Sequence, residues 1–139
     1  MNRSIMFFDT HCHIHMDVFG KEQNELVERM RLAQVCNAVV VATQTDEIKA
    51  VSNLTAQYPE LYGAFAVSPQ DEELTDMSPN EIAEIVKRPK MVAVGETGLD
   101  YHYCHEPLDW QRNRFALHIE AAHIAKKPLI IHSREAADD

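Results

Sequence analysis

Two histidines separated by a single residue, His11 and His13, follow the apolar beginning of the chain. At positions i and i+2 of a strand they point to the same face, roughly 6.7 Å apart along the chain, so one metal ion can bind both. Neutral imidazole nitrogens are common ligands of divalent metals, and an added carboxylate makes such a site suited to hydrolysis. Two histidines at this spacing can also be ordinary surface or core residues. Whether they form a metal site therefore depends on where the other potential metal ligands lie.

Two more side chains that can bind metal stand at the ends of apolar segments. Glu96 follows the run MVAVG, and His132 ends the run PLIIH. In parallel α/β folds the C-terminal ends of the strands form the active-site face. We therefore predict that one metal site collects His11, His13, Glu96 and His132.

Other conspicuous residues fit structural roles better. Cys12 alternates away from the two histidines and is expected to pack as a small hydrophobe. His118 and His123 lie within a helical segment, where we expect ordinary helical positions. Asp9 either accepts a hydrogen bond from one of the metal-site imidazoles or caps its strand. Residues 98–106, GLDYHYCHE, are expected to pack a loop or line a substrate site rather than bind metal.

The elements that must position these residues alternate along the chain. Short apolar runs are separated by longer segments of helical spacing, which is typical of a parallel sheet with helical crossovers. The predicted strands are residues 5–11, 37–43, 62–67, 91–95 and 129–132. The predicted helices are residues 22–34, 46–58, 78–88 and about 108–125. The third of these begins with a Ser-Pro start signal.

Composition indicates a single globular domain over residues 1–139. The chain is 45% hydrophobic and 25% charged, and its three cysteines form no CxxC pair, which favours a reducing compartment and a cytoplasmic location. Its apolar runs are too short for an export signal or a membrane span, so we expect no membrane partner. The formal charge of −9 argues against a broad basic surface for nucleic acid.

The number of elements limits the architecture. A complete barrel of eight strand–helix units takes about 250 residues, whereas this chain of 139 holds five predicted strands and four predicted helices. The sequence thus predicts either a smaller open α/β domain or the first part of a barrel. Residues 133–139, SREAADD, are expected to open a fifth crossover helix.

Three longer motifs carry a family resemblance. FDTHCHIHMDVF, VGETGLDYHY and QRNRFALHIEAAHIAKKPLIIHSREA resemble, in order and spacing, the N-terminal motifs of the TatD-type metal-dependent deoxyribonucleases of the amidohydrolase superfamily. The resemblance spans essentially the whole chain but only about the first half of a family member. It implies an α/β fold of the (β/α)8 TIM-barrel type, truncated to about five strands and four helices.

The resemblance also implies roles for individual residues. His11 and His13 would bind one metal, Glu96 would bridge two metals in the catalytic centre, and His132 would bind the second. Family members use two divalent ions, here Zn²⁺, Mn²⁺ or Mg²⁺, to hydrolyse phosphodiesters, commonly as 3′-to-5′ exonucleases on DNA. Such ions would supply the positive charge that an acidic protein lacks. Arg134, two residues after His132, is a candidate phosphate contact.

Departures from the family pattern leave alternatives open. Ser68 stands in AVSPQ where the family usually has a histidine before proline, so a substrate contact at Ser68 would be weaker. The family also takes a metal-binding histidine from the sixth strand and an aspartate from the eighth. One alternative is therefore a half barrel that binds metal or a partner chain without turnover, and five strands would leave an open edge for self-association. Another is an amidohydrolase acting on amides or lactones, although many of those carry a carboxylated lysine where Glu96 stands.

Overall fold

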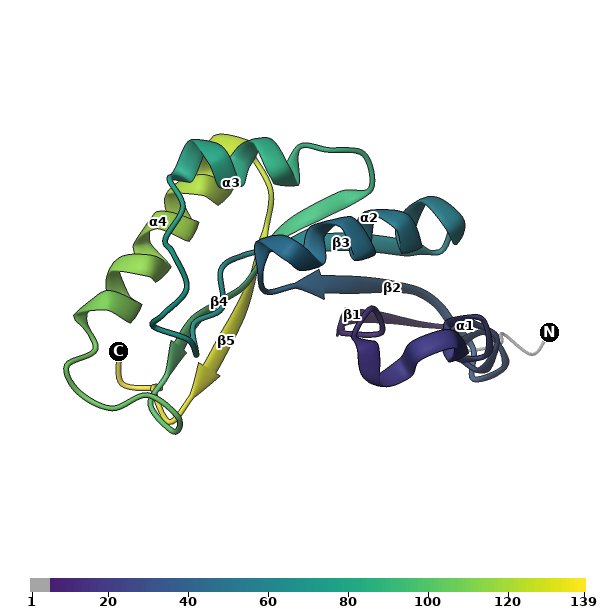
Figure 1. Ribbon diagram of the computed structural model, residues 1–139, viewed down its shortest axis with the longest axis horizontal. Coiled ribbons are helices and arrows are strands. Elements are labelled where there is room, and N and C mark those ends of the chain that lie inside the picture. Colours follow the sequence, from purple (N-terminus) through teal and green to yellow (C-terminus); the bar gives the residue numbers. More distant parts are fainter. Residues whose placement is uncertain (1–5) are drawn as a thin grey trace.

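Strands and helices alternate along residues 6–139, the part of the chain that the computed structural model describes (Figure 1). The strands are β1 Phe7–Cys12, β2 Val35–Ala42, β3 Leu61–Phe65, β4 Met91–Asp100 and β5 Leu129–Arg134. The helices are α1 Gln23–Leu32, α2 Ile48–Gln57, α3 Pro79–Val86 and α4 Asp109–Ala125, with short 3-10 turns η1 Asp17–Glu22 and η2 Thr45–Glu47. No helix among these residues is both long and apolar enough to span a membrane.

The five strands form one parallel sheet in the order β1-β2-β3-β4-β5. Each strand pairs with its neighbour in sequence, and a helix lies between each pair of consecutive strands. This sequential order is the one that builds the wall of a (β/α)8 barrel. The predicted α/β class and parallel sheet are confirmed.

Alternate residues of β2 show how the two faces of the sheet are used. Val40 packs on the helix side, in a large cluster with Val51 of α2 and Ile82 of α3. Val41 packs on the opposite side, in a small cluster that includes Ala64 of β3. Both valines are fully buried, which is why the strands read as continuous apolar runs rather than as alternating ones.

The third helix shows how local sequence sets a boundary. The Ser78 hydroxyl accepts a hydrogen bond from the backbone of Glu81, and the Glu81 carboxylate accepts one from the backbone of Ser78 at 2.9 Å. This capping box satisfies two backbone donors at the helix start, and Pro79 supplies a fixed φ at the first helical position. The sequence signal for this start is confirmed.

Two strands continue at least two residues past their predicted ends. β4 continues five residues past its predicted end, to Asp100, and β5 continues to Arg134. The backbones approach so closely at Gly98 that a Cβ atom there would collide with the carbonyl oxygen of His132. Glycine therefore lets the polar segment after Glu96 pair with β5. The predicted start at residue 5 lies outside the described residues, and residues 135–139 form no helix, so the expected fifth helix start is wrong.

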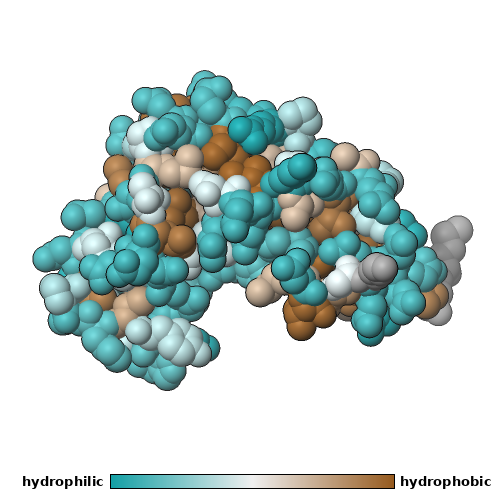
Figure 2. Space-filling model, in the orientation of Figure 1, coloured by the Kyte–Doolittle hydropathy of each residue, from teal (hydrophilic) through white to brown (hydrophobic). Residues whose placement is uncertain are grey.

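The sheet has two edges, β1 and β5, each with one neighbouring strand. Phe7 on β1 is 57% exposed and Ile131 on β5 is 60% exposed. Figure 2 shows hydrophobic groups open to solvent on the side of the molecule where β1 and α1 lie.

Candidate metal centre

The first strand delivers its two histidines through an irregular end. Asp9 pairs with Ala38 and Cys12 with Val40, so three steps along β1 match two along β2. Such a bulge bends the strand and re-aims the side chains beside it. His11 lies in this bulge and His13 directly follows the strand.

Asp9 and Cys12, which lie beside these histidines in the sequence, have structural roles. The Asp9 carboxylate accepts a hydrogen bond from the backbone N–H of His11 at 3.0 Å, so it holds the strand rather than an imidazole ring. The Cys12 thiol contacts the carbonyl of Val39 at 3.3 Å, and burial raises its pKa to about 11. A thiol that stays protonated and faces away is a packing group, as predicted.

Glu96 lies within β4 rather than at its end. Gly95 pairs with Ile130 and Thr97 with Ile131, which leaves Glu96 as the extra residue of a second bulge. The prediction that the strand ends here is wrong. The bulge frees Glu96 from the regular alternation of the strand, so its carboxylate can turn toward β1.

Three donor atoms from β1 and β4 converge. Nε2 of His11 lies 3.2 Å from Nε2 of His13, and Oε2 of Glu96 lies 2.8 Å from the first and 3.3 Å from the second. Strands β1 and β4 are three spacings apart in the sheet, roughly 14 Å if it were flat. The sheet therefore curls strongly, as the wall of a barrel does.

His132 of β5 joins the group from the other side of the carboxylate. Its Nδ1 lies 2.9 Å from Oε1 of Glu96, whereas Oε2 faces the β1 histidines. The four residues that the sequence singled out thus surround one carboxylate. Glu96 offers one oxygen to each of two neighbouring sites.

Hydrogen bonds to the protein fix the ring orientation of two histidines. Nδ1 of His13 donates to the backbone carbonyl of Val41 at 2.9 Å, which leaves Nε2 with a free lone pair. Nε2 of His132 lies 2.8 Å from Oδ2 of Asp100, which leaves Nδ1 to face Glu96. Metal-binding histidines ordinarily carry such an acceptor on the second nitrogen.

Sequence reasoning missed Asp100, which is fully buried. Burial acts to raise its pKa, but hydrogen bonds from Gln70, the Tyr103 backbone and His132 outweigh that effect and lower the pKa to about 2. The carboxylate is therefore ionised at neutral pH. The only available signal was the aspartate in GETGLD, five residues beyond the predicted strand end.

The electrostatics of the centre favour a bound cation. The close contact with His13 is the main cause that lowers the pKa of Glu96 to about 2, and the contact with Glu96 raises the pKa of His13. Ligands bound about 2.0–2.1 Å from one ion lie roughly 2.9–3.4 Å apart. Two of the three separations, 3.2 and 3.3 Å, fall in that range and the third, 2.8 Å, lies just below it, so two imidazoles and a carboxylate fit a divalent transition metal.

The two predicted substrate residues lie outside this group. The Ser68 hydroxyl accepts a hydrogen bond from the backbone of Gln70 at 3.1 Å. The guanidinium of Arg134 lies over the Tyr103 ring, 5.0 Å from its centre, and is exposed. Within residues 6–139 neither side chain makes a hydrogen bond or ion pair to the four convergent residues. Their substrate role stays a prediction.

Curled parallel strands with imidazoles and a carboxylate gathered where the strands end are typical of barrel-type metal-dependent hydrolases. Residues 8–139 match the model of the TatD related DNase family, and the chain belongs to that family.

Known relatives are similar over nearly the whole chain. It is 33% identical over 135 residues to the uncharacterized metal-dependent hydrolase YabD of Bacillus subtilis, covering 96% of this chain and 53% of the relative. It is 26% identical over 130 residues to the 3′-5′ ssDNA/RNA exonuclease TatD of Escherichia fergusonii, covering 93% and 50%. The crystal structure of YjjV, a TatD homolog from Escherichia coli K12, superimposes with a TM-score of 0.81 at 29% identity, covering 95% of this chain and 52% of that one.

These comparisons confirm the barrel-type fold and the family. The chain spans about half the length of the curated relatives that it matches. Most of these relatives are named only as metal-dependent hydrolases, and some are named exonucleases.

Proposed function

We propose that this protein is a two-metal phosphodiesterase that removes nucleotides from the 3′ end of single-stranded DNA. Relatives at 25–26% identity that are named 3′-5′ ssDNA/RNA exonucleases support the substrate class. The three free cysteines support a cytoplasmic location. We also propose that residues 1–139 act as one domain, and that copies associate through the open edges of the sheet.

One observation carries the proposal: the two oxygens of Glu96 face different partners. Oε2 faces His11 and His13, and Oε1 faces His132. A carboxylate placed in this way would help to hold two divalent ions, one together with His11 and His13 and the other together with His132. When bound, two divalent ions stabilise the charge of a phosphate and activate water near neutral pH.

The residues of this chain would prepare the centre for that chemistry. Glu96 is ionised because its pKa is low, and Val41 and Asp100 hold His13 and His132 in the orientation that presents a lone pair. Imidazole ligands suit Zn²⁺, whereas carboxylate oxygens suit Mn²⁺ or Mg²⁺. Ser68, which follows β3, and Arg134, at the end of β5, are proposed to contact the nucleic-acid backbone.

The test is a metal-dependent digestion of 5′-labelled single-stranded DNA by the wild-type chain and by Glu96→Gln. We expect stepwise shortening from the 3′ end, and a loss of roughly 100-fold or more in Glu96→Gln, since even indirect supports of a metal site contribute 10–100-fold. Glu84→Gln, on an exposed face of α3, is the matched control and should digest like wild type.

Asp100→Asn sharpens the same experiment. Because Asp100 contacts His132 rather than a metal, this variant should bind metal roughly 10–100-fold more weakly and regain activity as the metal concentration rises. Metal binding without DNA cleavage would replace the proposal with a half barrel that binds metal without turnover. Hydrolysis of amides or lactones in place of DNA would favour an amidohydrolase.

A further inference from the structure

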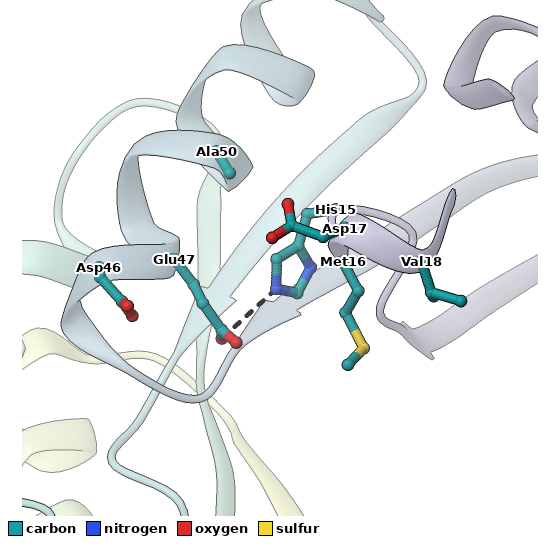
Figure 3. Close-up of a pocket in the computed structure, with 7 residues that line it drawn as sticks. All are labelled: His15, Met16, Asp17, Val18, Asp46, Glu47 and Ala50. Atoms are coloured by element: carbon teal, nitrogen blue, oxygen red, sulfur yellow. Dashed lines mark ion pairs between the residues drawn. The ribbon is translucent and has the colours of Figure 1, made fainter. Parts of the chain in front are cut away.

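An acidic cavity lies beside the candidate metal centre, where β1 and β2 end. It has a volume of about 380 Å³ and is formed by the turn after β1, by η1 and by the η2–α2 segment (Figure 3). Three carboxylates line it, those of Asp17, Asp46 and Glu47, and no lysine or arginine is among the lining residues. A cavity of this charge attracts cations.

His15 is the unusual residue of this cavity. It is only 6% exposed, and neither of its ring nitrogens has a hydrogen-bond partner within the described residues. Figure 3 shows the ring and the Glu47 side chain pointing toward one another from two different segments. Buried polar groups without a partner are costly, so a buried imidazole facing a cavity calls for a ligand there.

The contact between His15 and Glu47 has the separation of two ligands on one ion. Nε2 lies 3.3 Å from Oε2 and makes no hydrogen bond. Two ligands each about 2.0–2.1 Å from a tetrahedral ion are roughly 3.3 Å apart. The same Oε2 is held in place by the backbone N–H of Thr43 at 2.6 Å and by its hydroxyl at 3.2 Å.

We propose that this cavity binds a divalent transition-metal ion through His15 and Glu47, with Asp17 and Asp46 adding negative charge around it. The imidazole and carboxylate donors suit Mn²⁺ or Zn²⁺. The site is separate from the group around Glu96, because the ring of His15 lies 6.0 Å from that of His13 and contacts a different carboxylate. The proposal of a metal site at His15 and Glu47 does not depend on whether the protein cleaves phosphodiesters.

A cation bound at His15 would change the electrostatic potential of the face where the strands end. The cavity opens beside the C-terminal ends of β1 and β2, and the C-terminal ends of parallel strands form the face that binds ligands in this class of fold. A cation at His15 would place positive charge beside the Glu96 centre in a protein of net charge −9. Any anionic group that approaches this face would be attracted by the cation.

The experiment counts Mn²⁺ ions bound by the full chain, using the electron paramagnetic resonance signal of free Mn²⁺. His15→Asn and Glu47→Gln should each lose one ion relative to wild type, or bind it at least about 10-fold more weakly. The amide oxygen that Glu47→Gln introduces can still accept from Thr43, so the local fold is kept. Glu96→Gln should retain the His15 ion, and Glu96→Gln combined with His15→Asn should lose it.

Matched controls separate this site from general effects. His123→Asn, an exposed histidine of α4, and Glu84→Gln should bind as many ions as wild type. If His15→Asn does not fold, as judged by its circular dichroism, Glu47→Gln and the exposed pair Asp17→Asn/Asp46→Asn decide the question. Unchanged Mn²⁺ number and affinity in the folded variants would overturn the proposal, as would an equal loss in His123→Asn.

Discussion

The β1–α1 unit and the β4–α4 unit both supply ligands to the same candidate centre, but they are held very differently. β1 pairs with one strand, and its residues Phe7 to Thr10 are exposed. β4 pairs on both sides, and eight of its ten residues are buried. In Figure 1 the two units lie apart, with β2 and β3 between them in the sheet.

Buried polar side chains of α4 hold the β4–α4 unit and the loop beside it in place. The Arg114 guanidinium, in a residue only 2% exposed, donates to the carbonyls of Ser68, Asp71 and Leu74 and pairs with Asp76. One side chain therefore holds the whole β3–α3 loop.

Two neighbours on α4 extend this support. His118 accepts from the backbone of Val67 at 3.0 Å, and the Gln111 carbonyl oxygen accepts from the backbone of Asp100 at 2.9 Å. No comparable set of buried polar contacts joins α1 to β1 within the described residues. The comparison teaches that His132 is supported from α4 through Asp100 and Gln111, whereas His11 and His13 depend on the bulge and on local contacts.

The largest expected effect comes from breaking the network at its centre. Arg114→Leu should lower the free energy of unfolding by about 3–5 kcal/mol, because it leaves a carboxylate and three carbonyls without their donor. Urea unfolding measures the loss. Arg112→Leu is the matched control, since Arg112 lies on the same helix with exposed partners and should cost less than about 1 kcal/mol. Equal losses in the two variants would contradict the comparison.

A smaller effect is expected at His118. His118→Leu leaves the Val67 N–H without its acceptor, which should cost about 1–3 kcal/mol at pH 7.5. Burial lowers the pKa of His118 below 6.5, so the unfolded chain takes up its proton at a higher pH than the folded chain does. The stability contributed by neutral His118 is therefore present above pH 6.5 and declines as the pH falls below it.

Urea unfolding at pH 7.5 and pH 5.5 checks this sign. The wild type should lose more stability between the two pH values than His118→Leu does, so the difference between them should shrink at pH 5.5. A difference that grows at the lower pH would show that protonated His118 is the stabilising form.

The smallest effect on stability is expected at the open edge. Phe7→Lys should change the free energy of unfolding by no more than about 0.5 kcal/mol, because Phe7 is exposed. It should nevertheless lower the mass measured by light scattering, since a lysine on an edge strand opposes strand pairing between copies. Leu32→Lys, exposed at the end of α1, should leave the mass unchanged. A wild-type chain that is monomeric at high concentration would rule out association through this edge.

Much of the fold was predictable because its signals are local. Apolar runs and helical spacing predicted all five strands and four helices, with boundaries a few residues off. The boundaries failed at bulges and at Gly98, where β4 departs from regular alternation while pairing with β5.

The sequence by itself determined that metal-binding side chains follow or end apolar strands, since residue type and spacing are written along the chain. Only the tertiary structure decided that Glu96 lies 2.8 Å from His11, 85 positions away, and that Asp100 supports His132. It also decided that His15 faces Glu47 across a cavity. The physical reason is that these contacts depend on how strongly the sheet curls and where its strands bulge, which arise from packing between segments distant in sequence.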